Sequence, residues 1–233
     1  MRKTIGLIGG MSPESSAEYY RIINEASKAR LGGHRNVRTL MLTLDFGEIE
    51  TLQHRGEWAA LGEQLAAAAR SLQAGGADCI VLCTNTMHKL AASIESAVTI
   101  PLLHIADATG VAIRAARHAR VGLLGTRFTM EQDFYRQRLE RRHGLEVLVP
   151  DGEARETVHR IIYDELCHGV VRDESRRAYQ RVIAELGTRG AQAVILGCTE
   201  IAMLIAPQDS SLPVFDTTSL HAHGAVEWAL REA

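Results

Sequence analysis

The sequence predicts an α/β protein built from two similar, doubly wound parallel-sheet domains. Apolar runs typical of buried strands alternate with segments of helical length and periodicity, and this alternation occurs twice along the chain. The chain has 233 residues, of which 46% are hydrophobic, and a formal net charge of −2. That length is sufficient for two small domains, each with its own hydrophobic core.

Three pairs of short segments recur at nearly constant spacing, which indicates an internal duplication. The offsets between the paired segments are 114, 116 and 112 residues. The pairs are GADCIVLCTNT from Gly76 with GAQAVILGCTE from Gly190, IGLIGG from Ile5 with VGLLGT from Val121, and IPLLHIAD from Ile100 with LPVFDTTS from Leu212. Because three separate matches have nearly the same offset, we expect the two halves to share one topology.

The order of elements predicts right-handed βαβ units and therefore parallel sheets. We expect one domain over 1–101 plus 208–233 and a second over 102–207, with the last strand of each half exchanging places. Strands are expected at 4–8, 38–44, 78–83, 101–105, 120–124, 145–149, 192–196 and 213–216. Helices are expected at 13–30, 57–73, 86–97, 129–141, 153–167, 174–188 and 199–206, with a further helix after the last strand.

Two of the expected helices begin just after glycine turns that occupy matching positions in the two halves of the sequence. Ser12 and Pro13 predict a cap and a first-turn proline, and Thr129 with Gln132 fits a capping box. Backbone amides at such starts suit a carboxylate or phosphate, although glycines there can equally serve only the turn. GLIGGM does not have the GxGxxG spacing, so a dinucleotide site is not indicated.

The composition narrows the possible partners. A nearly balanced charge does not favour nucleic acid, no apolar stretch has the roughly 18 residues of a membrane span, and no cleavable leader is recognisable. We therefore expect a cytoplasmic protein that binds neither nucleic acid nor membrane. The four cysteines have no spacing typical of a disulfide framework or a metal site, so no metal is expected; they are Cys79, Cys83, Cys167 and Cys198.

In the alignment of the two halves, Cys198 falls opposite Thr84, and Thr199 opposite Asn85. Both pairs follow apolar strands, at the edge where open α/β sheets bind ligands. If the domains pack about a twofold axis, these residues line opposite walls of one interdomain cleft. An acid or base on each face of a carbon is what inversion of its configuration requires. A thiol near a helix start can have a lowered pKa, which would make thiolate available.

Other residues have less specific interpretations. Cys79, Cys83 and Cys167 are expected to be structural, and His88 and His104 satisfied in the core or solvated. Residues 53–57 are expected to form a polar loop that is either solvated or able to recognise a substrate carboxylate. Motifs for serine hydrolases, zinc proteases and phosphate-binding loops are absent, and no lysine has a pyridoxal-phosphate context.

Seven motifs are distributed along the chain: KTIGLIGGMSPES, QHRGEW, CTNTMHK, HIADAT, GTRFTMEQDFY, GCTEI and PVFDT. In these motifs the sequence resembles the aspartate/glutamate racemase family over essentially its whole length. It is most similar to the branch described as L-aspartate/glutamate-specific, or broad-specificity, amino-acid racemases. The resemblance implies a cofactor-independent, often dimeric enzyme that acts on acidic amino acids with two acid/base residues.

The first motif departs from the family pattern, because Thr84 stands where a cysteine is usual and Cys83 precedes it. The resemblance implies that Cys198 is the stronger acid/base and Thr84 its partner, with the L enantiomer favoured. It also implies that His168 stands where some relatives carry a lysine for the distal carboxylate. The implied substrate-binding residues are Met11, Gln53, Asn85, Thr86, Thr129, Thr199 and His168.

Two other functions fit the same residues. A single-cysteine decarboxylase or isomerase would use Cys198 to protonate a planar intermediate from one face only. A binding protein without turnover would use the same cleft as a sensor of amino acids.

Overall fold

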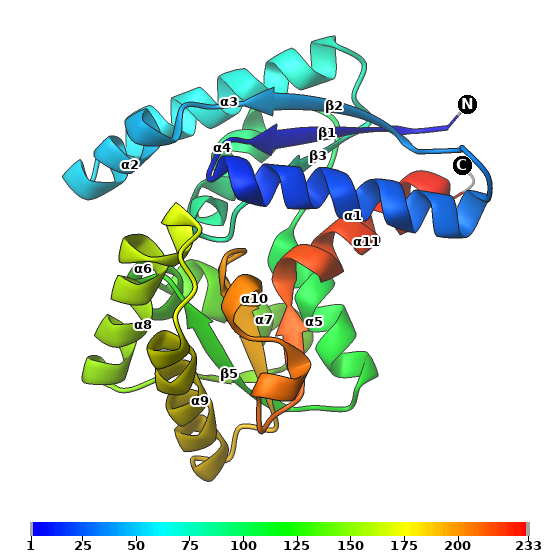
Figure 1. Cartoon of the computed structure of the whole chain (residues 1–233). Coiled ribbons are helices and arrows are strands. Elements are labelled where there is room, and N and C mark those ends of the chain that lie inside the picture. The colour runs from blue at the N-terminus through cyan, green and yellow to red at the C-terminus, as the bar shows by residue number, and fades with distance from the viewer. Residues whose placement is uncertain (1, 232–233) are drawn as a thin grey trace. The chain divides into compact units, whose positions relative to one another are not determined.

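Two four-stranded parallel sheets organise residues 2–231, the part of the chain that the computed structural model describes. Their strand orders are β2-β1-β3-β4 and β6-β5-β7-β8. Every strand pair in both sheets is parallel. The second sheet repeats the order of the first, as the duplicated sequence predicts, and the expected α/β architecture is confirmed (Figure 1).

The described residues divide into two compact units. Unit 1 contains the residues up to Ile105 and those from His221 onward, and unit 2 contains Ala106–Leu220. The elements of unit 1 are β1 (Thr4–Gly9), α1 (Pro13–Leu31), β2 (Arg38–Thr43), α2 (Phe46–Arg55), α3 (Trp58–Ala74), β3 (Cys79–Leu82), the 3₁₀ turn η1 (Thr86–Leu90), α4 (Ala91–Ala97), β4 (Leu102–Leu103) and most of α11 (Thr217–Leu230).

Unit 2 has the same alternation of strands and helices. Its elements are α5 (Ile105–Ala115), β5 (Arg120–Gly125), α6 (Arg127–Glu131), α7 (Asp133–His143), β6 (Glu146–Leu148), α8 (Gly152–Asp164), η2 (Leu166–His168), α9 (Asp173–Thr188), β7 (Ala193–Gly197), α10 (Ile201–Leu204), η3 (Pro207–Asp209) and β8 (Val214–Asp216).

Strand alternation divides the core of unit 1 into two layers. Ile5, Leu7 and Val81 pack with α1 and α11 on one face of the sheet, whereas Ile8 and Leu82 pack with α2, α3 and α4 on the other (Figure 1). Neighbouring side chains of a strand point to opposite faces, so both layers need apolar residues. In unit 2, α8 and α9 cover one face of the sheet in the same way.

The last strands do not exchange places as the sequence suggested. β4 pairs with β3 in unit 1, and β8 pairs with β7 in unit 2. The chain passes from unit 1 to unit 2 at the start of α5 and returns to unit 1 inside α11. Both passages therefore lie in helices and not next to exchanged strands.

Several local expectations need correction. The polar segment from Gln53 is not a loop, because α2 continues to Arg55 and ends at Gly56 in the left-handed conformation. Helix α5 was not expected at all. Thr129 is not a cap: Thr126 caps α6 by accepting a hydrogen bond from the Thr129 amide, and Thr129 lies inside the first turn.

The N-terminal cap of α1 is confirmed. Ser12 accepts a hydrogen bond from the Ser15 amide, and proline occupies the first turn. Across residues 2–231, no helix is both long enough and apolar enough to cross a membrane.

Candidate active site

The chain leaving β3 carries Thr84, Asn85 and Thr86, and side chains from two other elements hold its backbone. Ser15 Oγ of α1 donates a hydrogen bond to the Cys83 carbonyl at 3.1 Å. His88 Nδ1 lies 2.7 Å from the Thr84 carbonyl oxygen. Thr84 is 9% exposed and the two residues after it are also buried. The position of the Thr84 backbone is therefore set by contacts on both of its sides.

Met11 lies just after β1, and Gln53 lies on α2, the helix that follows β2. Gly10 precedes Met11 with φ of +91°, and a Cβ at Gly10 would meet the Leu44 carbonyl oxygen at 2.1 Å, so only glycine fits this turn. Gln53 is buried on α2, and its Nε2 lies 3.0 Å from Met87 Sδ. Met11 and Met87 belong to one apolar cluster. The predicted site residues of unit 1 thus gather at the carboxyl edge of its sheet.

Cys198 and Thr199 follow β7 directly, at the corresponding edge of the sheet in unit 2. The Cys198 thiol donates a hydrogen bond to Glu200 Oε2 at 2.9 Å, and Thr199 Oγ1 donates to the same oxygen at 2.6 Å. Cys198 and Thr199 are half-buried, whereas Glu200 is only 5% exposed. A buried carboxylate therefore accepts hydrogen bonds from both side chains of the predicted motif.

The electrostatics of Cys198 differ from the expectation of a readily available thiolate. Burial and the adjacent Glu200 charge raise the pKa of the Cys198 thiol well above its ordinary value, and Cys167 adds to this effect. A thiolate beside a carboxylate would place two negative charges together in a poorly solvated site. Burial and the Glu200 charge therefore favour the protonated thiol over the thiolate at this strand end.

Thr129 lies at the ends of the two central strands of unit 2. It is fully buried, and a Cβ at Gly125 would meet the Thr129 Cβ at 3.1 Å. Gly125 and Gly197 are paired in the sheet, and a Cβ at Gly197 would meet the Leu124 carbonyl oxygen at 2.7 Å. Glycines at both strand ends therefore permit close approach of the threonine-bearing turn.

His168 is exposed at the end of η2, the turn that follows α8. η2 packs against α10, the short helix after Glu200. The neighbouring Cys167 packs against the same apolar cluster as Cys198. The structure thus places His168 in the same unit as Cys198 and on a neighbouring element, with its side chain open to solvent.

The remaining cysteines of unit 1 are buried in the sheet. Cys79 and Cys83 have no exposed surface and lie in the layer that faces α1 and α11, opposite to Leu82. Burial raises the pKa of Cys79 to about 12 and that of Cys83 further. Their placement agrees with a structural role.

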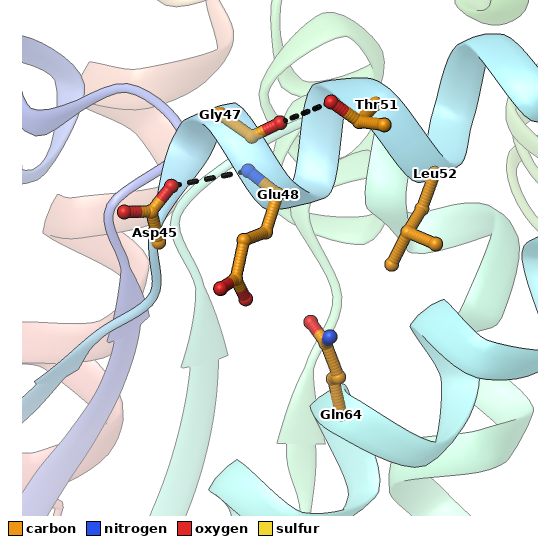
Figure 2. A pocket seen from close by; sticks show the side chains of 6 residues that line it. All are labelled: Asp45, Gly47, Glu48, Thr51, Leu52 and Gln64. Atoms are coloured by element: carbon orange, nitrogen blue, oxygen red, sulfur yellow. Dashed lines mark hydrogen bonds between the residues drawn. The ribbon is translucent and has the colours of Figure 1, made fainter.

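A separate hollow of about 540 Å³ lies between α2 and α3. Figure 2 shows Glu48 and Gln64 extending from the two helices toward the hollow, while Asp45 accepts a hydrogen bond from the Glu48 amide and Thr51 donates one to the Gly47 carbonyl. It does not contain the predicted site residues. Within residues 2–231, no group of three or more His, Cys, Asp or Glu side chains could hold a metal ion.

Two side chains with direct contacts to the predicted acid/base residues were not expected in these roles. Glu200 stands two residues after Cys198, so its proximity was readable in the GCTE sequence, but its direction was not. His88 is four residues from Thr84, and its bond to the Thr84 carbonyl depends on the irregular turn between them.

Comparisons with known proteins agree with the fold and the motifs. A family model for Asp/Glu/hydantoin racemases matches residues 8–225. The chain is similar to a solved protein from Yersinia pestis provisionally named an Asp/Glu racemase, with 54% identity, a TM-score of 0.92 and coverage of 98% of this chain and 100% of that chain. It is also similar to an aspartate racemase homologue from Pyrococcus horikoshii OT3, with 33% identity, a TM-score of 0.86 and coverage of 99% and 100%.

A more distant similarity extends to a curated protein. The chain is 20% identical to the broad specificity amino-acid racemase RacX of Bacillus subtilis (strain 168), over 95% of this chain and 96% of that protein. The family model spans most of the chain, and both solved relatives cover it almost completely with more than 30% identity. The chain therefore belongs to the Asp/Glu/hydantoin racemase family.

Proposed function

We propose that this amino-acid racemase interconverts the enantiomers of aspartate and glutamate without a cofactor, by proton transfer at Cα between Cys198 and Thr84. The observation that carries the proposal is the thiol of Cys198, half-buried at the end of β7 and hydrogen-bonded to Glu200 at 2.9 Å. Thr84 follows β3, the strand that occupies the same place in the other sheet. The proposal requires both strand ends to close on one substrate.

The reaction needs one group that removes the α-proton and another that returns a proton to the opposite face. A protonated Cys198 supplies the returning proton directly, and the carbanion then becomes the inverted amino acid. In the reverse direction Cys198 must first lose its proton, and Glu200 Oε2 lies where it can receive it. On the other face, when Cys198 has removed the α-proton, the Thr84 hydroxyl donates its proton to the carbanion and water then reprotonates the Thr84 oxygen. In the opposite direction, Thr84 first gives its hydroxyl proton to water, and its oxygen then takes the α-proton.

The two acid/base residues are chemically unequal, and this should make the enzyme asymmetric. A hydroxyl is a much weaker acid than a thiol, so Thr84 and Cys198 cannot exchange roles at equal rates. The enantiomer whose α-proton faces Cys198 should be deprotonated more readily. By resemblance to the family branch, we assign that enantiomer as L.

Polar groups at the two strand ends would bind the substrate. Asn85, Thr86 and Thr199 would hold the α-carboxylate with amides and side chains. Met11, Gln53 and Thr129 would line the pocket. Exposed His168 would approach the distal carboxylate, and an imidazole in place of a lysine there would tolerate substrates beyond aspartate and glutamate. We further propose that the protein is cytoplasmic and forms a homodimer. Sedimentation of the purified protein would test the homodimer.

The test is proton NMR of the protein with L- and D-aspartate and L- and D-glutamate in D₂O, combined with chiral analysis of the products. Loss of the α-proton signal and appearance of the opposite enantiomer are expected. Both should be lost in Cys198→Ala, and inversion should be lost in Thr84→Ala. The matched controls, Cys79→Ala in the sheet core and Thr188→Ala at the exposed end of α9, should retain activity.

The alternatives give different results in the same experiment. A decarboxylase or isomerase would leave the α-protons of all four substrates intact and would instead release carbon dioxide or move a double bond in another substrate. A binding protein would show thermal stabilisation by amino acids that persists in Cys198→Ala, without any exchange. Equal rates from both enantiomers at saturation would contradict the asymmetry between Cys198 and Thr84.

A further inference from the structure

The imidazole of His88 joins the backbones that leave two neighbouring strands. The β3–β4 ladder pairs Ile80 with Leu102 and Val81 with Leu103. Beyond this ladder, His88 Nδ1 lies 2.7 Å from the Thr84 carbonyl oxygen, and the Ile105 amide donates to His88 Nε2 at 3.2 Å. The ring therefore takes the place of backbone pairing where the strands diverge.

These two bonds define the protonation state of the ring. A carbonyl oxygen can only accept a hydrogen bond, so His88 Nδ1 carries the proton. The Ile105 amide can only donate, so Nε2 is unprotonated and accepts this hydrogen bond through its lone pair. His88 is therefore neutral, in the Nδ1–H form, and it is 2% exposed.

Other aromatic groups restrict the movement of this ring and of the backbone it binds. The His88 ring centroid lies 4.3 Å from that of His104 and 5.9 Å from that of His221. His221 Nε2 donates to the Leu103 carbonyl at 2.7 Å, and its Nδ1 lies 2.8 Å from the Tyr19 hydroxyl oxygen. The backbone is thus held both at Leu103, the last residue of β4, and at Ile105 beyond it.

We propose that His88 is a positioning residue for the reaction, because it sets the orientation of Thr84. Ser15 holds the carbonyl before Thr84, and His88 holds the carbonyl of Thr84 itself. With both peptide planes fixed, the backbone dihedrals of Thr84 and the direction of its Cα–Cβ bond are fixed too. This inference rests on the proposed function, in which the Thr84 hydroxyl serves one face of Cα.

The ratio of α-proton exchange to inversion in D₂O tests this role. For the enantiomer whose α-proton faces Cys198, removal of the proton and return of a deuteron by Cys198 give exchange without inversion. Inversion needs Thr84 as well, because the proton must then be added from the opposite face. Misplacing Thr84 therefore raises the ratio of exchange to inversion. A general loss of folded enzyme lowers both rates in proportion and leaves the ratio unchanged.

Two substitutions separate the two bonds of the ring. His88→Asn retains an N–H near the position of Nδ1, so it can still donate to Thr84, but it does not reach Ile105. His88→Gln places its amide near the position of Nε2, so it can accept from Ile105 but leaves the Thr84 carbonyl. We expect the ratio to rise about tenfold or more in His88→Gln, and to stay close to the unsubstituted value in His88→Asn.

Each outcome separates this inference from the proposed function. No exchange from any substrate in the unsubstituted enzyme would refute the proposed function. Exchange with an unchanged ratio in His88→Gln would refute only the positioning role of His88. His34→Asn, on an exposed turn before β2, controls for the loss of an imidazole and should leave the ratio unchanged.

Nitrogen-15 NMR of the histidine rings provides a measurement that does not depend on activity. The His88 signals, assigned by their loss in His88→Asn, should show a neutral ring protonated at Nδ1 at neutral pH. A neutral ring protonated at Nε2, or a charged ring, would overturn the inference even if the enzyme is active.

Discussion

Replacing Glu200 by glutamine should make the Cys198 thiol easier to ionise. Burial is the largest cause of the raised pKa of this thiol, and the Glu200 charge is the next. Glutamine retains an oxygen acceptor of the same size at 2.9 Å but removes the negative charge. The pKa of Cys198 should therefore fall, although burial still keeps it above that of a solvated thiol.

The size of the effect follows from the distance. Two unit charges 2.9 Å apart repel by about 1.4 kcal/mol at the dielectric constant of water and by about 6 kcal/mol at an effective value of about 20. The smaller energy raises the thiolate fraction at neutral pH about tenfold. A less basic thiolate is also less nucleophilic, which offsets part of this gain. The net increase in alkylation rate is about threefold for the dielectric constant of water and about 200-fold for the effective value of about 20.

The assay is alkylation of the native protein by iodoacetamide at neutral pH, with the four cysteines resolved by peptide mass spectrometry. Faster modification of Cys198 in folded Glu200→Gln is expected. Glu174→Gln, on the exposed first turn of α9, is the matched control and should not change the rate. Unchanged or slower modification of Cys198 in Glu200→Gln would refute the electrostatic explanation.

Two further predictions concern stability. Burial is the largest single influence on the pKa of Asp107 and raises it, but the hydrogen bonds and charge of Arg138, together with His143 and Arg142, hold this pKa below its usual value. Because Arg138 donates to Asp107 at 2.6 and 2.7 Å, Asp107→Asn should lower the free energy of unfolding by about 1–2 kcal/mol at neutral pH. Because the pKa of Asp107 is lower in the folded than in the unfolded state, this stabilisation is present above about pH 4 and is lost as the pH falls further. The free energies of unfolding of the unsubstituted protein and Asp107→Asn, measured in urea, should therefore converge in acid. A difference independent of pH would contradict the ion pair. Gly10→Ala should cost about 2 kcal/mol or more, because its Cβ would meet the Leu44 carbonyl, whereas Gly32→Ala, also at positive φ but with open space around it, should cost less in the same urea unfolding assay.

The sequence was sufficient to predict the regular part of the fold. Apolar runs such as residues 193–197 could only be buried strands, and the helical segments between them required parallel pairing. The repeat of these segments predicted two sheets with one topology, which the structure confirms. Local signals also predicted the Ser12 cap. A helix cap needs only a hydrogen bond to an amide three residues later, here that of Ser15, so it is encoded in a short stretch of sequence.

Some elements had readable signals that the sequence interpretation did not use. Helix α2 begins after Asp45, which accepts a bond from the Glu48 amide, and ends at Gly56 in the left-handed conformation. These are ordinary start and stop residues, but the polar QHRGE segment obscured them. Thr126 was missed as a cap in favour of Thr129, which is also a threonine and lies only three residues later.

What the sequence determined by itself is the order of the strands and the strand ends at which Thr84 and Cys198 lie, because hydrophobic periodicity and glycine turns act over a few residues. Only the tertiary structure decided the state of these groups. The raised pKa of Cys198 depends on burial among residues distant in the chain, and the contacts of His88 and His221 join segments 17 and 118 residues apart. Desolvation and hydrogen bonds at such separations exist only once the core has formed, so no local pattern of residues encodes them.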